Sequence, residues 1–325
     1  MSQTQKEDRT SSSFAQIENI KTKVPYYEFY MNQDLRNIYI HFYGFLHKIP
    51  CLKHNDKLAI KLGWYSHMSY RLNLKHPVSY NEKLQWMKLF DHNPSYTQMV
   101  DKFAVKDYVA NIIGREYVIP TLGVWDSFDD IDFSLLPNQF VLKCTHDSGG
   151  LVICKDKSML DVCAAKAKIE NSLAVDFYAM GREWPYKNVP KRIIAEEYKE
   201  DKKTGELRDY KFFCFNGRVK WMFIATERQH HEEPYFDFFD EDFNHLDIRQ
   251  GHPNAPKIPE KPINFEIMKQ LASKLSKNLK QIRVDFYEVD GKVYFGELTF
   301  FHHGGWTPFE PEEWDYIFGK ELQLR

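Results

Sequence analysis

Apolar residues recur every three or four positions along the first third of the chain. Over residues 31–49 they would share one face of a helix, and Pro50 ends that segment. Residues 1–13 are polar and aperiodic, so we expect a flexible tail there and a helical region over residues 14–98. Further helices are predicted at residues 56–68, 81–90 and 98–112.

After Pro137 the pattern changes to short apolar runs typical of strands. Phe140–Cys144 and Leu151–Cys154 are two such runs, and a shorter one precedes them at 118–120. The other expected elements are helices at 158–173, 264–280 and after Pro311, strands at 193–198, 210–215 and 219–225, hairpins at 234–248 and 282–300, and a loop at 253–262.

Composition narrows the class of protein. The 325 residues are 43% hydrophobic, which excludes a mainly disordered chain, and their number predicts more than one domain. A net charge of −2 argues against a general nucleic-acid coat. No apolar run approaches the roughly eighteen residues that span a bilayer, and the N-terminus lacks a signal-peptide core. Five scattered cysteines without a CxxC pair suit reduced thiols, so we expect a cytoplasmic protein.

Positive charge gathers near the N-terminus. Residues 36–75 contain seven Lys or Arg residues and a single acid, Asp56. Such a surface could dock an anionic glycan or the inner membrane surface where glycans are assembled. The alternative, which the sequence favours, is a helical cap whose charges are only solvated.

A glycine-containing loop joins two of the predicted strands, in Lys143-Cys-Thr-His-Asp-Ser-Gly-Gly150. Its glycines would let the backbone approach an anion, and its N–H groups could bind phosphate oxygens. Lys143 would add a positive charge from the preceding strand. No GK[ST] follows, so this is not a Walker loop. An ordinary hairpin turn with a surface lysine is the alternative.

The C-terminal hairpin carries Arg283 and Asp285 on one strand, and Glu297 and Thr299 on the next. Oxygen ligands of this kind suit Mg²⁺ shared with a nucleotide's phosphates. For all four side chains to share a face, we expect a three-residue loop that pairs Glu288 with Lys292 and places Gly291 at positive φ in a G1 bulge. An exposed salt-bridge face is the alternative, but the surrounding aromatic residues favour a half-buried cleft.

Other patterns are less specific. Glu196 and Glu197 follow an apolar run and could lie beside a nucleotide, or could be charged strand ends on the surface. Two Asp-x-Asp or Asp-Glu-Asp matches, at 130–132 and 240–242, resemble nucleotide-sugar transferase motifs but are expected by chance among 46 acids. The adjacent pairs His230-His231 and His302-His303 point opposite ways on a strand and rarely hold one metal ion.

Taken in order, six segments resemble the ATP-grasp superfamily, and most closely its teichuronopeptide-biosynthesis (TupA-like) branch among bacterial surface-polysaccharide proteins. They are HPVSYNEKLQWMKLF, DKFAVKDYV, LPNQFVLKCTHDSGG, IIAEEY, DYKFFCFNGRVK and RVDFYEVDGKVYFGELTF. The resemblance implies an α+β fold in which two subdomains, expected at 99–190 and 191–325, clamp ATP. It also implies that ATP and Mg²⁺ serve to join a carboxylate to an amine.

The resemblance also implies residue roles. Arg283 is placed like the arginine that stabilises the oxyanion, and Lys211 like a phosphate-contacting base. Thr299 stands where many members have Asn, which puts full coordination of one magnesium ion in doubt. The implied ATP-binding residues are Lys102, Lys143, His146, Ser148, Gly149, Gly150, Glu196, Glu197, Tyr198 and Asp209, and the implied metal ligands are Asp285, Glu297 and Thr299.

The resemblance implies an ATP-grasp ligase acting on a uronic acid of a bacterial capsular or cell-surface polysaccharide, with an amine or amino acid as second substrate. The net charge adds the expectation of no nucleic-acid partner. A glycosyltransferase that uses a nucleotide sugar is the alternative, and a glycan-binding scaffold without catalysis is a third.

Overall fold

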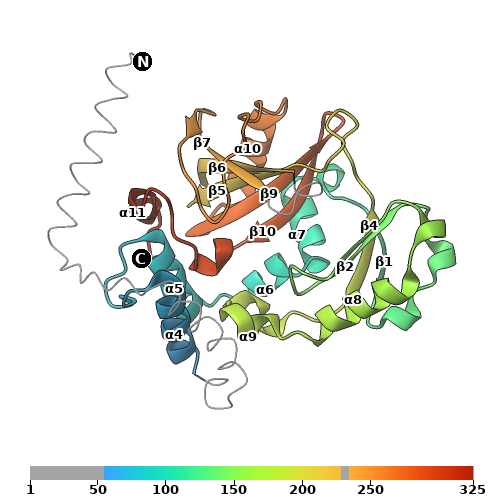
Figure 1. Cartoon of the computed structure of the whole chain (residues 1–325), viewed down its shortest axis with the longest axis horizontal. Coiled ribbons are helices and arrows are strands. Elements are labelled where there is room, and N and C mark those ends of the chain that lie inside the picture. The colour runs from blue at the N-terminus through green and yellow to red at the C-terminus, as the bar shows by residue number, and fades with distance from the viewer. Residues whose placement is uncertain (1–54, 228–233, 325) are drawn as a thin grey trace.

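The computed structural model describes residues 55–227 and 234–324, which form two β-sheets flanked by helices (Figure 1). The expected tail at 1–13, the amphipathic segment at 31–49 and the pair His230-His231 lie outside the described residues. Helices together with antiparallel sheets confirm the α+β class. Within the described ranges, no helix has both the length and the apolar character to cross a membrane.

The smaller sheet has four antiparallel strands in the order β1-β4-β2-β3. Alternation along β2 buries Phe140 and Leu142 in a core that includes Ile169 of helix α8. Lys143, one residue further on, therefore points to the other face. The elements of this part are β1 (Thr121–Trp125), β2 (Phe140–Cys144), β3 (Leu151–Cys154), β4 (Ile193–Glu197) and α8 (Val162–Ala174).

Strand β4 lies in the smaller sheet, whereas the expected division of the chain between residues 190 and 191 separates it from that sheet. That division assigns β4 to the C-terminal subdomain, whereas the strand pairs with β1 and β2. The chain thus enters the larger sheet only after β4 has completed the smaller one.

The larger sheet has six antiparallel strands in the order β10-β9-β5-β6-β7-β8. Helix α10 (Phe265–Leu275) packs on one face, where the rings of Phe212 and Phe265 lie 6.0 Å apart. Lys211 and Phe213, each one residue away from Phe212, therefore point to the opposite face. The strands are β5 (Asp209–Phe215), β6 (Arg218–Thr226), β7 (Tyr235–Asp240), β8 (His245–Leu246), β9 (Gln281–Val289) and β10 (Lys292–Thr299).

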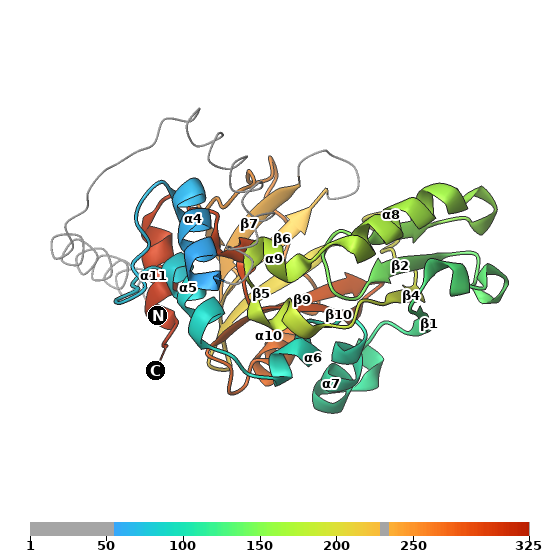
Figure 2. The ribbon, with the colours of Figure 1, turned by 90° about the horizontal axis from the view of Figure 1, so that it is seen from below.

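Helices α5 (Tyr80–Phe90) and α11 (Glu313–Glu321) cover one end of that opposite face (Figures 1 and 2). The rings of Tyr80 and Phe318 lie 6.4 and 5.2 Å from the ring of Phe213. The other helices are α4 (Asp56–Met68), α6 (Ser95–Val100), α7 (Ala104–Ile113) and α9 (Phe177–Gly181), with 3₁₀ turns η1 (Arg115–Tyr117), η2 (Phe128–Asp130), η3 (Phe133–Leu135), η4 (Lys157–Met159), η5 (Trp184–Asn188) and η6 (His302–Gly305).

The helix predicted over 98–112 is two helices, α6 and α7, because Asp101 interrupts it. The Asp101 carboxylate accepts hydrogen bonds from the backbone N–H groups of Phe103 and Ala104 at 2.9 and 3.3 Å, so it satisfies amides at the start of α7. The short strand expected at 118–120 is also wrong, since the strand of this region is β1, which begins at Thr121.

Candidate active site

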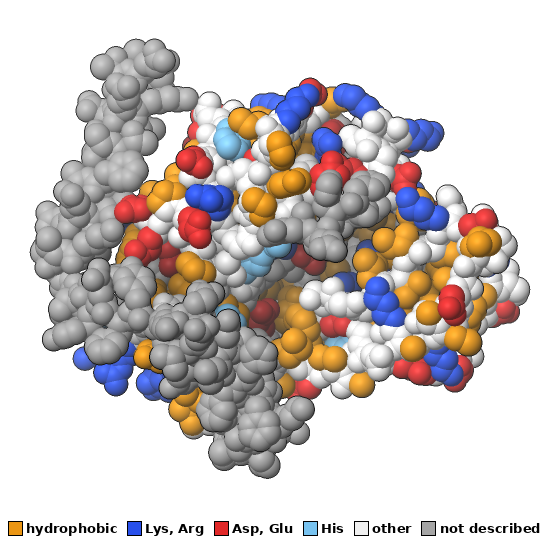
Figure 3. All heavy atoms as spheres, viewed as in Figure 1, with side chains coloured by type: hydrophobic (Ala, Val, Ile, Leu, Met, Phe, Trp, Pro, Cys, Tyr) orange, Lys and Arg blue, Asp and Glu red, His pale blue; other side chains and the backbone are white. Residues whose placement is uncertain are grey.

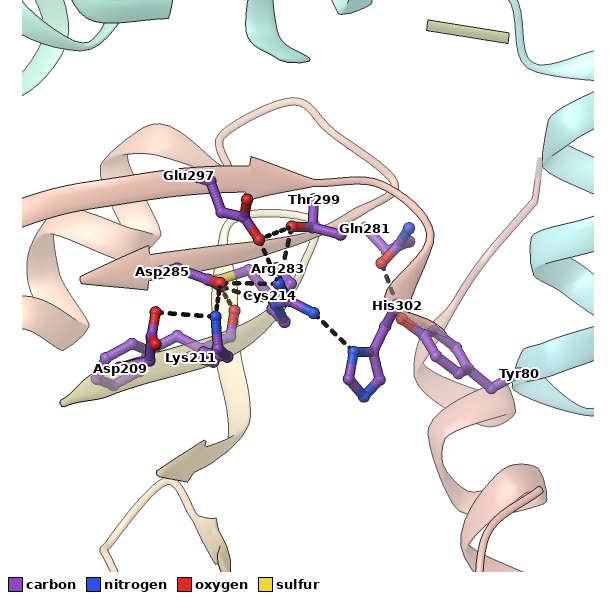
Figure 4. Close-up of polar contacts among 11 residues, drawn as sticks. Tyr80, Asp209, Lys211, Cys214, Gln281, Arg283, Asp285, Glu297, Thr299 and His302 are labelled. Carbon is purple, nitrogen blue, oxygen red and sulfur yellow. Dashed lines mark hydrogen bonds and ion pairs between the residues drawn. The ribbon is translucent and has the colours of Figure 1, made fainter. Parts of the chain in front are cut away.

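Polar side chains of three neighbouring strands meet on the face of the larger sheet turned away from α10 (Figure 4). Alternate residues of a strand share a face, which brings the side chains of β5, β9 and β10 together. We call this group the polar strip; it consists of Asp209, Lys211, Arg283, Asp285, Glu297 and Thr299.

Arg283 joins the strip together. Its Nε and Nη2 atoms donate to the Asp285 carboxylate at 2.7 and 2.8 Å. Nη2 also donates to Glu297 Oε1 at 2.7 Å and to Thr299 Oγ1 at 2.9 Å. Asp285 is fully buried, so these charge-assisted hydrogen bonds, with an ion pair to Lys211, compensate the loss of its hydration. The arginine and both proposed metal-binding acids therefore form one unit.

The turn of this hairpin differs from the prediction. Lys292 pairs with Val289, so Asp290 and Gly291 form a two-residue turn. Both have positive φ, 49° and 75°, as a type I′ turn requires. The positive φ of Gly291 is confirmed, whereas the three-residue loop and the G1 bulge are wrong.

A β-bulge further along β10 brings the acids to one face instead. The register slips by one residue between Phe295 and Leu298, so that Gly296 and Glu297 together lie opposite Asp285. A Cβ on residue 296 would lie 3.1 Å from the Asp285 carbonyl oxygen, which explains why glycine suits this position. The predicted shared face is confirmed, and its cause is the bulge.

The charges of the strip keep Glu297 ionised. Burial alone would raise the pKa of Glu297, but Lys211, Arg283 and Lys102 outweigh it and hold that pKa at about 2. Burial alone would lower the pKa of Arg283, yet Asp285 and Glu297 raise it above its usual value. Both groups are therefore charged at neutral pH.

Asp285, Glu297 and Thr299 offer the oxygen ligands that Mg²⁺ prefers. In the described part of the chain, no three His, Cys, Asp or Glu side chains gather into a complete metal site. Two carboxylates fit a Mg²⁺ ion whose other ligands are phosphate oxygens and water. Arg283 and Thr299 bond to Glu297 through Oε1 alone, and the Glu297 side chain is 45% exposed. Glu297 Oε2 therefore offers one oxygen to a shared magnesium ion, whereas both oxygens of the fully buried Asp285 are bonded to Arg283 and Lys211 and would have to be released to bind it.

A cleft of about 190 Å³ lies between the Glu297 end of the strip and the smaller sheet. The space-filling view shows the surface hollowed between the two sheets (Figure 3). The cleft brings together several residues singled out in the sequence, and Lys106, which was not. Its lining includes Lys102, Lys106, Lys143, Asp147, Ser148, Gly150 and Glu196 on one side and Tyr287, Phe295, Gly296 and Glu297 on the other.

Glu196 holds two lysines at the wall of this cleft. Its carboxylate lies 2.6 Å from Lys106 Nζ and 2.5 Å from Lys143 Nζ. Burial alone would raise the pKa of Glu196, but the two lysines hold it at about 2. Burial lowers the pKa of Lys106, and Glu196 opposes that change. Sequence reasoning missed Lys106, although the helix expected over 98–112 would have placed it on the same face as Lys102, four residues earlier. In the structure Lys102 precedes α7, and only Lys106 lies within it.

The loop after β2 is held by a hydrogen bond within it and by two side chains from outside it. Asp147 accepts from the Gly150 backbone N–H at 3.1 Å and from the Ser172 hydroxyl of α8. Lys102 donates to the Asp147 carbonyl. The expected phosphate loop and the expected phosphate lysine are thus in direct contact.

Gly150→Ala is expected to destabilise the protein, whereas Gly149→Ala is expected to have little effect. A Cβ on residue 150 would lie 2.5 Å from both Cys144 Sγ and Ser172 Oγ, while one on residue 149 would have no neighbour closer than 3.8 Å. Overpacking of this kind costs about 1–3 kcal/mol. The midpoints of thermal unfolding without nucleotide test this, and equal midpoints for the two variants would contradict it.

The remaining predicted residues lie away from the lining of the cleft. Glu197 points to the other side of β4 from Glu196 and pairs with Lys199 at 2.8 Å. Tyr198 donates to Glu200. Asp209 is buried, 3.0 Å from Lys211 Nζ. His146 is also buried, which lowers its pKa, and Gly149 follows it in the loop without lining the cleft.

The family model of the TupA-like ATP-grasp proteins matches residues 82–323, which is most of the chain. This protein belongs to the TupA-like ATP-grasp family. The match contains both sheets, the polar strip and the cleft. The family and the ATP-grasp fold expected from the sequence are both confirmed.

Solved structures also show similarity to this family member. A D-alanine–D-alanine ligase from Bacillus anthracis, complexed with ATP, is 15% identical, with 62% of this chain and 53% of that one covered and a TM-score of 0.37. The ATP-grasp ligase PsnB with minimal precursor, Mg and ADP is 10% identical (68% and 57% covered, TM-score 0.36). A RimK domain protein from Sphaerobacter thermophilus is 9% identical (70% and 69% covered, TM-score 0.39).

The chain spans about half the length of the D-alanine–D-alanine ligase that it matches. Comparison with curated protein sequences gives no match.

Proposed function

We propose that this TupA-like protein is an ATP-dependent carboxylate–amine ligase that uses Mg²⁺. The observation that carries the proposal is the composition of one cleft. One wall holds lysines and a glycine loop, and the other holds Glu297, which Arg283 joins to Asp285. The phosphates of ATP require positively charged groups, and the Mg²⁺ that accompanies them requires carboxylate oxygens. This cleft has the lysines on one wall and the acids on the other.

The nucleotide's phosphates would lie between the loop and the polar strip. Lys102 and Lys143 bind phosphate oxygens from the side of the smaller sheet, and the Ser148–Gly150 backbone covers them. Lys211 adds positive charge from β5. Glu196 orients Lys143 and Lys106 at the wall of the cleft. Asp285, Glu297 and Thr299 would hold Mg²⁺, which would neutralise phosphate charge there.

The reaction has two steps. The substrate carboxylate attacks the γ-phosphorus, ADP leaves, and an acyl-phosphate forms. An amine then attacks the acyl carbon, and phosphate leaves as the amide forms. Arg283 stabilises the negative charge that develops on the carbonyl oxygen, a role that suits a guanidinium held by several hydrogen bonds.

We infer a hexuronic acid of a bacterial capsular or cell-surface polysaccharide as the carboxylate, from the family's association with such glycans. An amine or amino acid is the second substrate, and we place the protein in the cytoplasm, at or near the inner membrane face. Lys57 and Lys61 of the basic region are exposed on α4, which supports capture of an anionic glycan there.

ATP with Mg²⁺ is expected to stabilise the protein against heat, and UDP-sugars are not. A ligand at 100 times its Kd adds about 2.7 kcal/mol to the free energy of unfolding. The thermal midpoint with each nucleotide tests binding, and ADP release with a uronate and a panel of amines tests the reaction. Stabilisation by UDP-sugars but not by ATP–Mg²⁺ would favour a glycosyltransferase instead.

A further inference from the structure

His302 lies directly behind Arg283, on the side away from Asp285 and Glu297 (Figure 4). It is the first residue of η6, just after β10, and only 1% of it is exposed. Its ring packs against Phe213 and Phe223, with centroids 5.0 and 5.2 Å away. These aromatic neighbours fix the plane of the imidazole.

Its contact with Arg283 sets the protonation of the ring. Arg283 Nη1 lies 2.7 Å from His302 Nδ1. Because a guanidinium only donates hydrogen bonds, Nδ1 must be the acceptor, and the proton of the neutral ring must be on Nε2. Burial lowers the pKa of His302 well below its usual value, and His303, Arg283 and Lys211 add to that effect. The ring is therefore a neutral acceptor at pH 7.

This contact differs in kind from the other hydrogen bonds of Arg283. Nε and Nη2 bond to Asp285, Glu297 and Thr299, the three proposed metal ligands. Among the described residues, His302 is the one hydrogen-bond partner of the guanidinium outside that set. Oxygens that bind a metal ion bond less strongly to an arginine, but Nδ1 of His302 is unaffected by such competition.

We propose that His302 is a positioning residue, which accepts from Arg283 through Nδ1 and so holds the guanidinium at the reacting centre. It would do so even when Asp285, Glu297 and Thr299 bind a metal ion and bond less strongly to Arg283. The inference rests on the proposed function, in which Arg283 stabilises the oxyanion. Loss of a hydrogen-bond partner that orients a metal ligand typically lowers activity about 10–100-fold, and we expect an effect of that order for a partner that orients Arg283. The alternative is that His302 only fills space between Phe213 and Phe223.

Two substitutions separate positioning from packing. In His302→Asn the side-chain oxygen can take the place of Nδ1 and accept from Arg283. In His302→Gln the amide reaches the place of Nε2 and leaves Nη1 without its acceptor. We expect His302→Gln to lower kcat about 10–100-fold with ATP KM nearly unchanged, and His302→Asn to retain kcat within about threefold. Equal loss in both variants, or wild-type kcat in His302→Gln, would overturn the proposal.

A spectroscopic measurement tests the contact without any turnover. In the wild-type protein labelled with ¹⁵N-histidine, with the His302 signals assigned by their loss in His302→Asn, we expect at pH 7 a neutral ring with the proton on Nε2. A proton on Nδ1 would overturn the proposal. If wild type releases no ADP with any carboxylate–amine pair, the proposed function fails, and the ¹⁵N signals still decide whether His302 accepts from Arg283.

Discussion

Glu196→Gln is expected to lower the free energy of unfolding by about 3 kcal/mol or more at pH 7. The substitution leaves Lys106 and Lys143, which lie 2.6 and 2.5 Å from the carboxylate, without their counter-ion. Removing one partner of a buried ion pair typically costs about 3–5 kcal/mol, because the charge left behind is buried and uncompensated. Urea denaturation of wild type and variant measures the difference.

Glu197→Gln on the same strand is the matched control. Glu197 also pairs with a lysine, Lys199 at 2.8 Å, but its side chain is 40% exposed, so the expected loss is below about 1 kcal/mol. Equal losses in the two variants would contradict the buried Glu196 network.

The Glu196 effect should also depend on pH. The folded-state pKa of Glu196, about 2, is below its ordinary value of 4.5. The ionised carboxylate therefore stabilises the fold above pH 4.5, and that contribution is lost as the pH falls from 4.5 towards 2. The difference between wild type and Glu196→Gln is expected to shrink over the same interval.

Arg283→Lys is expected to lower kcat by about 10²–10³, with a much smaller change in the KM for ATP. Lysine keeps a positive charge beside the fully buried Asp285, so the loss of charge that alanine would cause is avoided. It cannot reproduce the planar set of donors that reaches Asp285, Glu297 and His302 together. Loss of one preorganised donor at an oxyanion typically costs this much in rate. Initial rates of ADP release measure the effect.

Arg115→Lys makes the same chemical change at an exposed ion pair, where Arg115 lies 2.7 Å from Asp107 and is 69% exposed. Its kcat is expected to match wild type. An Arg283→Lys enzyme that also matched wild type would remove Arg283 from the chemistry.

The C-terminal hairpin illustrates how far local sequence reasoning extends. Alternation along β9 placed Arg283 and Asp285 on one face, and Gly291 was expected at positive φ; both are found. The sequence did not reveal the bulge at Gly296 and Glu297, because a bulge depends on how one strand pairs with its neighbour. The three-residue loop predicted before Lys292 would shift the register of the hairpin by one residue. The structure has that shift at the bulge instead, so the loop has only two residues.

Helix α7 is a second such case. The apolar spacing over 98–112 was correct as a pattern, but Asp101 divides it by bonding to the N–H groups that open α7. Asp101 also pairs with Arg192 at 2.7 Å, far along the chain. Periodicity reports which face is buried and gives no account of such polar contacts.

By itself, the sequence determined the family, the α+β class, most elements of the two sheets and the residue types of the polar strip, because alternation and helical spacing are local properties of the chain. The tertiary structure alone decided that Lys106 shares Glu196 with Lys143 and that His302 accepts from Arg283. These contacts join segments that are distant in sequence, and their geometry follows from the packing of one sheet, helix or turn against another.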